Sequence, residues 1–239
     1  MPERRRPVTA LVLVGGLGTR LRPVLSDRPK PLAPVGDRPF VCRILDQLAA
    51  AGLREAVLCT GHLGGRVREV LGDRHGPLDL RYSQEDTPLG TGGALRRAEP
   101  LAQGDTVLAL NGDSYFGLPL AAYLDWHTGL GLEASLAIRQ VEDGSRYGRV
   151  EIDGEGRVTS FREKAAGPGP GWINAGIYLF AREALRALPA DRPVSLEREV
   201  LPAWLHHLRA YRAEGPFLDI GTPESLATAE AFFRTTGEA

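Results

Sequence analysis

A glycine-rich turn and a proline-framed lysine are the first residues of this sequence whose types and spacing suit phosphate chemistry. Gly15, Gly16 and Gly18 directly follow an apolar run. Glycines this close together let the backbone approach a polyphosphate and turn its N–H groups toward it. Lys30 lies further along, in the sequence Pro-Lys-Pro. Together these residues predict a site for an anionic ligand such as a nucleoside triphosphate.

Lysine and asparagine are unusually rare in this chain. Only two of the twenty-nine basic residues are lysine, at Lys30 and Lys164, and asparagine occurs only at Asn111 and Asn174. A planar guanidinium cannot replace a compact ammonium that meets a phosphate as a point charge. We therefore treat these four residues as candidates for positions at which function overrode the compositional bias.

Two common phosphate-binding motifs do not fit the glycine turn. A dinucleotide fingerprint needs a further glycine where Leu21 stands, followed at once by a helix. A Walker A loop ends in Gly-Lys-Ser or Gly-Lys-Thr, and neither occurs in the sequence. The turn is therefore of another kind, and it carries its own arginine, Arg20.

The composition limits the kind of protein further. A chain of 239 residues with 43% apolar and 25% charged residues suits one large globular domain. The net charge of −1 argues against a nucleic-acid or anionic-membrane binder. Cys42 and Cys59 form no CxxC pattern, which favours a reducing compartment. Arginines at 4–6 and the apolar run after them lack the cleavage site of a signal peptide, so we expect a cytoplasmic protein.

The hydrophobic pattern predicts the elements that position these residues. Up to Asp113, apolar strands alternate with helical segments, which is typical of a doubly wound parallel sheet. The strands are apolar at nearly every position because both faces of such a sheet are buried. The expected strands are 8–14, 56–60, 78–83 and 106–110, and the expected helices are 40–51, 65–71 and 92–98.

Beyond 115 the alternation gives way to antiparallel strands. We expect strands at 134–141, 148–152, 157–161 and 173–180, a turn at 153–154, a loop at 166–171, and helices at 120–127, 196–208 and 224–233. The whole chain, 1–239, is expected to form a single α/β domain. Its Rossmann-like, doubly wound mixed sheet would have helices on both faces, with a nucleotide-binding half at about 7–115 and a substrate-binding half at about 116–239.

In order and spacing, the motifs of the chain resemble those of the sugar-1-phosphate nucleotidyltransferases. They are GGLGTRLRP at 15–23, PKPLAPV at 29–35, PLGTGGAL at 88–95, NGD at 111–113, FREK at 161–164, NAGIYLF at 174–180 and FLDIGTP at 217–223. The resemblance implies a Rossmann-like mixed α/β fold. It also implies transfer of a nucleotidyl group from a nucleoside triphosphate to a sugar 1-phosphate, with release of pyrophosphate.

The resemblance further implies roles for single residues in the nucleotide half. Arg20 would hold the β- and γ-phosphates, and Lys30 would lie near the α-phosphate and the sugar phosphate. Asp113 would share a Mg²⁺ ion with Asp219, and hard oxygen ligands with bridging phosphates suit that ion. The nucleotide site would also include Gly15, Gly16, Gly18, Thr19, Glu85 and Gly90.

Four residues of the second half would meet the sugar by the same resemblance. The Glu163 carboxylate would accept hydrogen bonds from sugar hydroxyls, and the Lys164 ammonium would meet the sugar phosphate. The Asn174 amide can both donate to and accept from a polyol. Gly148 would allow the sugar to approach closely, whereas Asn111 is expected to shape the strand end rather than touch substrate.

Gln84 and Glu85 are alternatives for reading the base. Guanine presents two adjacent donors that one carboxylate can accept, whereas uracil and thymine match an amide better. Glu85 pointing inward would favour GTP, and Gln84 pointing inward would favour UTP or dTTP. EDTPLGTGG at 85–93 and SLEREVLP at 195–202 are most similar to guanylyltransferases that act on D-glycero-α-D-manno-heptose 1-phosphate. Mannose-1-phosphate guanylyltransferases and short uridylyltransferases of the N-acetylmuramate 1-phosphate type are the alternatives.

Other classes of protein fit less well. A nucleotide-sugar-dependent glycosyltransferase would want a DxD metal motif, but Ser114 and Tyr115 follow Asp113. A non-catalytic nucleotide-binding regulator is disfavoured because the predicted catalytic arginine, lysine and aspartates are all present. The five histidines show no triad order or metal pattern, so we interpret them as structural. The sequence does not indicate an oligomeric state.

Overall fold

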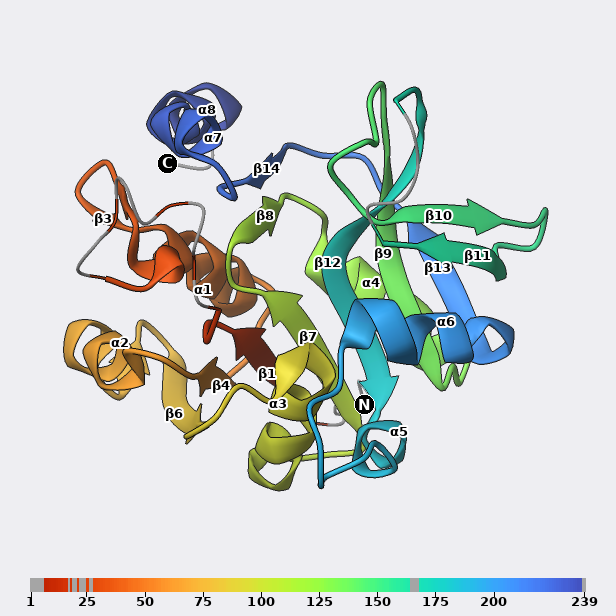
Figure 1. Cartoon of the computed structure of the whole chain (residues 1–239), viewed down its shortest axis with the longest axis horizontal. Helices are drawn as coiled ribbons and strands as arrows, with labels where there is room; N and C mark the ends of the chain where they lie inside the picture. The colour runs from red at the N-terminus through yellow and green to blue at the C-terminus, as the bar shows by residue number, and fades with distance from the viewer. Residues whose placement is uncertain are drawn as a thin grey trace, which may run out of the picture.

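The computed structural model describes residues 7–16, 18, 21, 25, 28–163 and 168–237. Ten strands of this described chain form one sheet in the order β5-β6-β4-β1-β7-β12-β9-β13, with β10 and β11 branching from β12 (Figure 1). The strands are β1 (Val8–Leu13), β4 (Glu55–Thr60), β5 (Arg74–His75), β6 (Leu78–Gln84), β7 (Thr106–Asn111), β9 (Ala134–Val141), β10 (Arg149–Ile152), β11 (Val158–Arg162), β12 (Gly171–Ala181) and β13 (Leu208–Arg212).

The sheet is parallel on the nucleotide side and mixed on the other. β1 pairs in parallel with β4 and β7, and β4 pairs in parallel with β6. β12 pairs antiparallel with β7 and β9, while β13 returns parallel to β9. The inner residues of β1, β4 and β7 are all buried, which two-sided coverage requires. The predicted mixed α/β sheet is therefore confirmed.

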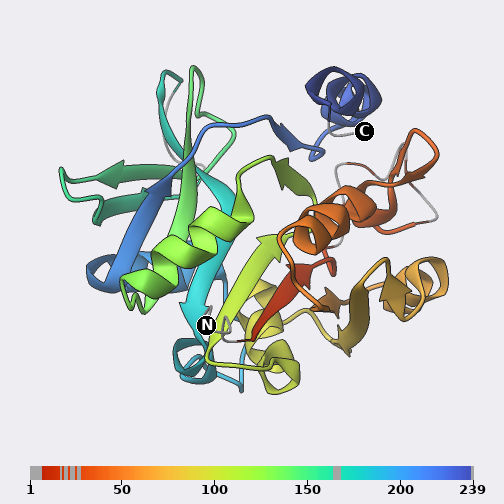
Figure 2. The same ribbon diagram turned by 180° about the vertical axis from the view of Figure 1, so that it is seen from behind.

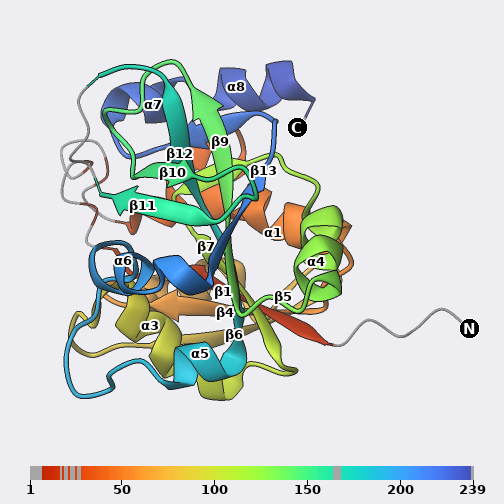
Figure 3. The ribbon, with the colours of Figure 1, turned by 90° about the vertical axis from the view of Figure 1, so that its right-hand side faces the viewer.

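Helices cover both faces of the sheet, as Figures 2 and 3 show from behind and from the side. Ala10 and Val12 of β1 point into a core shared with α1, α2, α4 and α8. Leu11, between them, points into the opposite core, shared with α3, α5 and α6. This alternation follows from the period-two geometry of a strand. The helices are α1 (Phe40–Ala50), α2 (Gly64–Leu71), α3 (Gly90–Ala98), α4 (Leu120–Gly129), α5 (Arg182–Arg186), α6 (Leu201–Ala203), α7 (Pro223–Ala227) and α8 (Ala229–Thr236).

Short elements bring the C-terminal segment back to the centre of the sheet. β8 (Ser114–Phe116) leaves the end of β7 and pairs antiparallel with β14 (Phe217–Asp219). A second pair, β2 (Pro34–Val35) and β3 (Arg38–Pro39), precedes α1. Short 3-10 helices form at η2 (Lys30–Leu32) and η3 (Glu99–Leu101). The β8–β14 pair is the one that matters for the site, because it carries Asp219 to Asp113.

The single helix predicted over 196–208 is wrong. The chain instead forms a π-helical turn, η4 (Leu196–Val200), then α6, a 3-10 turn η5 (Leu205–His207) and the strand β13. Pro202 has no backbone N–H and its ring crowds the preceding turn, so it lies at the start of the short helix α6 and interrupts the regular hydrogen-bond pattern of a longer helix. Leu208 and Ala210 alternate with more exposed residues, which is a strand period rather than a helical one.

The predicted C-terminal helix is also divided, into α7 and α8 on either side of Thr228. Its first part begins at Pro223, one residue before the predicted start, because Thr222 is the N-cap and forms a reciprocal capping box with Ser225. Within the described part of the chain, none of the helices has the length and apolar character needed to span a bilayer.

Candidate active site

The carboxyl ends of β1 and β7 lie side by side at one edge of the parallel half of the sheet. Their last paired residues are Leu13 and Asn111. Gly112 N donates to Leu13 O at 2.9 Å, and a Cβ at Gly112 would lie 2.6 Å from that oxygen. Only glycine permits this approach. The glycine turn after β1 and Asp113 after β7 therefore start from the same edge, where open α/β sheets bind ligands.

Lys30 reaches Asp113 at this edge. Its Nζ lies 2.6 Å from Asp113 Oδ2, and only 11% of the lysine side chain is exposed. The lysine begins η2, where Leu32 N donates to Pro29 O, so the turn holds the base of its side chain. Gly18, with φ +55°, lies against this stem, since a Cβ there would be 3.4 Å from Lys30 Cβ. The glycine turn and the predicted catalytic lysine thus form one structural unit.

Asp219 joins the pair from the far end of the chain. It stands opposite Ser114 in the β8–β14 register, and Ile220 N donates to Asp113 O at 3.0 Å. Ser114 Oγ lies 3.0 Å from Asp219 Oδ2 and 3.4 Å from Asp113 Oδ1, so one hydroxyl bridges both carboxylates. Gly221 N donates to Asp219 Oδ1 at 2.7 Å. The structure therefore brings together the two aspartates predicted to share a metal ion.

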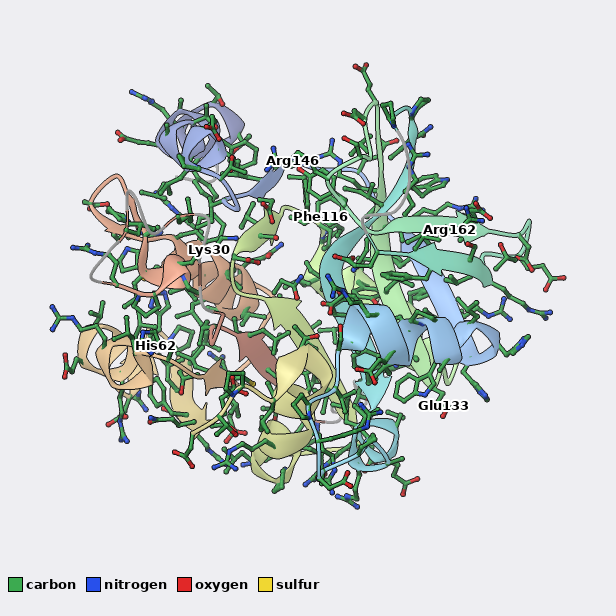
Figure 4. The ribbon with its side chains drawn as sticks, in the orientation of Figure 1. Lys30, His62, Phe116, Glu133, Arg146 and Arg162 are labelled. Carbon is green, nitrogen blue, oxygen red and sulfur yellow. The ribbon has the colours of Figure 1, made fainter. Side chains whose placement is uncertain are left out.

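The donor set at this point fits Mg²⁺ only with help from a substrate. Across the described ranges, no group of three or more His, Cys, Asp or Glu side chains is placed to hold a metal. Two carboxylates leave room for phosphate oxygens and water, which is how Mg²⁺ is usually held beside nucleotides. Arg146 Nη2 lies 3.9 Å from Asp219 Oδ1. Figure 4 shows Lys30 on the N-terminal half and Arg146 on the C-terminal half.

Two cavities adjoin this cluster, and Gly16 and Thr91 line both of them. The smaller, of about 260 Å³, is lined by Lys30 and Asp113. The larger, of about 570 Å³, is lined by Glu85 and Gly15. A Cβ at Gly15 would lie 2.8 Å from Gly61 N, whereas nothing lies within 4 Å of one at Gly16. The first glycine is thus needed for packing, and the second leaves its backbone open to both cavities.

Glu85 points into the larger cavity in a fixed orientation. Leu89 N donates to Glu85 Oε2 at 3.1 Å, and a Cβ at Gly61 would lie 2.8 Å from Glu85 Oε1. Burial raises the pKa of this carboxyl, and the hydrogen bond from Leu89 and the charge of Arg97 oppose the rise. Gln84 also lines the cavity but is exposed. Of the two alternatives for reading the base, Glu85 is the one that is anchored inward.

Gly90 lines the same cavity, yet packing already explains why it is glycine. Its φ is +72°, and a Cβ there would lie 2.5 Å from Val194 O. Gly92 N and Gly93 N donate to the same oxygen at 2.9 and 3.2 Å. The segment before η4 therefore closes the N-terminus of α3. This contact ties the larger cavity to the C-terminal half of the chain.

Glu197 is a cavity residue that the sequence analysis missed. It lines the smaller cavity with Lys30 and Asp113. Thr91 Oγ1 donates to Glu197 Oε2 at 2.7 Å and accepts from Leu196 N at 2.8 Å. Burial raises the pKa of the Glu197 carboxyl, the Thr91 hydrogen bond opposes the rise, and the charges of Glu163 and Asp113 add to it. The Glu197 carboxyl is therefore close enough to feel the charge of a predicted sugar residue, Glu163, and of a predicted metal ligand, Asp113.

Three of the predicted sugar residues, Gly148, Glu163 and Asn174, lie together next to the pairing of β10 with β12. Asn174 N donates to Gly148 O at 2.8 Å, and a Cβ at Gly148 would lie 2.9 Å from Glu163 Oε2. The Asn174 amide donates to Tyr178 Oη at 2.7 Å and accepts from Gly176 N at 3.1 Å, across the bulge in β12. Asn174 and Glu163 are therefore neighbours, and the Asn174 side chain is already oriented by the bulge.

Three of the predicted site residues, Thr19, Arg20 and Lys164, lie outside the described residues. Asn111, which is expected to shape the strand end, packs against Gly176. A Cβ at Gly176 would lie 2.8 Å from Asn111 Nδ2, and Gly176 has a φ of +74°. Asn111 also lines the smaller cavity. Among the histidines, buried His127 bonds to Ser135 Oγ at 2.8 Å within the core, away from both cavities.

The fold and this cluster agree with one family of known proteins. Residues 9–236 match the family described as Nucleotidyl transferase, and the chain belongs to it. A mannose-1-phosphate guanylyltransferase of Mycobacterium tuberculosis is 38% identical over 229 residues, which cover 94% of this chain and 64% of the relative. The chain thus spans less than two thirds of that relative's length.

A second relative and a solved structure match over nearly their full lengths. A D-glycero-alpha-D-manno-heptose 1-phosphate guanylyltransferase of Campylobacter jejuni is 35% identical, with 90% of this chain and 95% of the relative covered. The crystal structure of HddC from Yersinia pseudotuberculosis superposes with a TM-score of 0.85 at 30% identity, covering 94% of this chain and 99% of that one. HddC has also been solved in complex with GMP-PN, with a TM-score of 0.84.

Proposed function

We propose that the protein transfers a guanylyl group from GTP to a sugar 1-phosphate and releases pyrophosphate. The sugar phosphate is D-glycero-α-D-manno-heptose 1-phosphate in this proposal. The observation that carries it is the position of Lys30, Asp113 and Asp219 beside two cavities that share Gly16 and Thr91. Such a layout suits two substrates that meet at a phosphate.

The reaction needs alignment and charge neutralisation rather than a nucleophilic side chain. A phosphate oxygen of the sugar 1-phosphate forms a bond to the α-phosphorus of GTP, and the bond from that phosphorus to the β-phosphate oxygen breaks. Pyrophosphate leaves with the electron pair. Two polyanions must approach each other, so positive charge and orientation supply most of the rate.

Lys30 would change partner during this reaction. Its ammonium is paired with Asp113 Oδ2 in the structure. When the substrates bind, Asp113 and Asp219 would hold Mg²⁺, and Lys30 would turn to the α-phosphate. The ion, when bound, stabilises charge on the phosphate oxygens. Arg146, near Asp219, and Arg20 would hold further phosphate charge.

The base and the sugar would occupy different cavities. Glu85 would accept the two adjacent N–H donors of guanine in the larger cavity, which is the reason for preferring GTP. The sugar would lie on the side of the smaller cavity, where the lining residue Glu197 would accept hydroxyl hydrogen bonds, as would Glu163 beside Gly148. We accordingly assign 7–115 to nucleotide binding and 116–239 mainly to the sugar, with Asp219 returning to the shared metal.

Mannose 1-phosphate is a second candidate acceptor. It is favoured by the 38% identity to the Mycobacterium tuberculosis guanylyltransferase. The heptose 1-phosphate is favoured by the Campylobacter jejuni guanylyltransferase, 95% of whose length is covered.

Mass spectrometry of the products, with each acceptor offered together with GTP and Mg²⁺, tests the proposal. The expected product is GDP-heptose, with less GDP-mannose. Formation of no GDP-sugar from either acceptor would contradict it.

A further inference from the structure

Leu63 has a backbone conformation that its residue type disfavours. Its φ is 62° and its ψ is 23°, and it is the one non-glycine residue with positive φ in the described part of the chain. It occupies the third position of the turn 61–64, closed by Gly64 N donating to Gly61 O at 2.9 Å. Glycine or asparagine is the usual residue for a left-handed position of this kind.

The glycines of this turn are used for other purposes. A Cβ at Gly61 would lie 2.8 Å from Glu85 Oε1, and one at Gly64 would lie 2.8 Å from Thr60 Oγ1. Both are therefore required by close packing. The turn thus has glycine at 61 and 64, where a side chain would collide with its neighbours, and leucine at 63, where the backbone conformation itself favours glycine. Strained residues of this kind cluster at ligand sites, and an observed outlier supports a hypothesis of function.

The Leu63 side chain is not used by the core. It is 41% exposed and belongs to neither of the two hydrophobic cores of the described chain. It does line the larger cavity, together with Leu13, Pro88 and the Glu85 carboxylate. Figure 4 places its neighbour His62 beside α2, on the half of the molecule that carries Lys30. The strained turn therefore places the Leu63 side chain at the cavity rather than in the hydrophobic core.

We propose that Leu63 is a specificity contact for the base, pressing its isobutyl group on the face of a guanine ring whose edge is read by Glu85. The inference rests on the proposed guanylyl function. A flat heteroaromatic ring needs polar partners at its edge and apolar atoms over its face. Glu85 follows β6 and Leu63 follows the neighbouring parallel strand β4, so the two side chains can supply these from adjacent strand ends. Inorganic phosphates, which have no such face, gain nothing from Leu63.

Calorimetric titration of the full chain with GTP and with inorganic tripolyphosphate, without an acceptor sugar, tests this contact. Leu63→Gly and Leu63→Asn relieve the strain and remove the apolar group. Each is expected to weaken GTP binding about tenfold, the size of partial loss of a buried leucine contact, with tripolyphosphate binding unchanged. Leu63→Met keeps an apolar group and is expected to keep GTP binding. Val70→Ala, at an exposed apolar residue of the following helix α2 that lies outside the larger cavity, is the control.

Urea unfolding completes the test, because Leu63→Gly is expected to be at least as stable as the original chain. A less stable variant would overturn the strain argument. If the original chain prefers GTP to tripolyphosphate and the glycine and asparagine variants keep all of that preference, Leu63 is not a base contact. If the original chain shows no such preference, the guanylyl function fails together with this inference. Equal weakening of both ligands would mean that the turn, not the leucine, matters.

Discussion

Lys30 Nζ lies 2.6 Å from Asp113 Oδ2, so the lysine proposed for the α-phosphate is paired with an aspartate proposed for the metal. The two charges neutralise each other in a place where substrate phosphates and a metal ion would separate them. If a phosphate and Mg²⁺ bind together, the Lys30–Asp113 pair would be replaced by two pairs, Lys30 with the phosphate and Asp113 with the metal ion.

Lys30→Arg is expected to lower kcat by about 100-fold or more, the scale seen on losing one transition-state donor. A guanidinium forms a bidentate pair with a carboxylate, so it would hold Asp113 instead of turning to the phosphate. Steady-state kinetics measure this loss. Arg68→Lys, on an exposed ion pair with Asp73, is the matched exchange and should leave kcat unchanged. Near-normal turnover of Lys30→Arg would refute the special role given to the lysine.

Asp219→Asn is expected to raise the Mg²⁺ concentration needed for half-maximal activity and to lower kcat by about 100-fold, because metal stabilisation is worth several kcal/mol. The amide keeps a group near Ser114 and Gly221 but loses the charge that holds the ion. A Mg²⁺ titration of activity measures both effects. Asp73→Asn serves as the control. An unchanged Mg²⁺ dependence would remove Asp219 from the metal site.

Glu85→Gln is expected to lower the ratio of kcat/KM for GTP to that for UTP by about 10- to 100-fold, the size of one hydrogen bond to a charged group. The amide presents a donor to guanine N–H groups and matches uracil better. Gln84→Ala should leave the ratio unchanged, because that side chain is exposed. A ratio that follows Gln84 rather than Glu85 would reverse the assignment.

Thr91→Val is expected to raise the KM for the sugar 1-phosphate by about tenfold, since one hydrogen bond to a charged group is worth about 1.5 kcal/mol or more. The variant removes the donor to Glu197 and the acceptor for Leu196 N. Thr91→Ser keeps the hydroxyl and should restore the KM. If the serine variant is as impaired as the valine variant, the methyl group and not the Glu197 contact is responsible.

Because His127 is buried, we expect the free energy of unfolding to decrease in acid. Burial lowers its pKa from 6.5 to about 4. Between these values the unfolded chain binds more protons than the folded chain, so the free energy of unfolding falls as the pH falls, by up to about 1.4 kcal/mol per pH unit. Urea unfolding from pH 7 to 4 should show a flatter dependence in His127→Gln. His207→Gln, at an exposed histidine, should match the original chain. Parallel curves for His127→Gln would contradict this.

The central strands and the phosphate edge were predictable from local pattern. The inner residues of β4 and β7 are continuous apolar runs, and the parallel order of β1, β4 and β6 follows from the helices between them. The meeting of Asp113 with Asp219 followed from the family resemblance, since no local rule indicates that β14 pairs with β8.

The features that the sequence analysis missed, Glu197 and β13, depend on contacts between segments far apart in the chain. Glu197 and Glu199 look alike in the sequence, because both lie in the same short acidic segment. The structure distinguishes them: Glu197 lines the cavity and accepts from Thr91, whereas Glu199 is exposed and paired with Arg192. The resemblance at 195–202 was the signal that could have found Glu197. β13 was missed because its five residues are too short for their alternation to outweigh the helical pattern before them.

Pyrophosphate release over a matrix of GTP, ATP, UTP and dTTP against heptose, mannose, glucose and N-acetylmuramate 1-phosphates tests the guanylyl assignment most directly. The account predicts the highest kcat/KM for GTP with D-glycero-α-D-manno-heptose 1-phosphate, with mannose 1-phosphate next. Turnover that is fastest with UTP or dTTP, or release with none of the pairs, would contradict it.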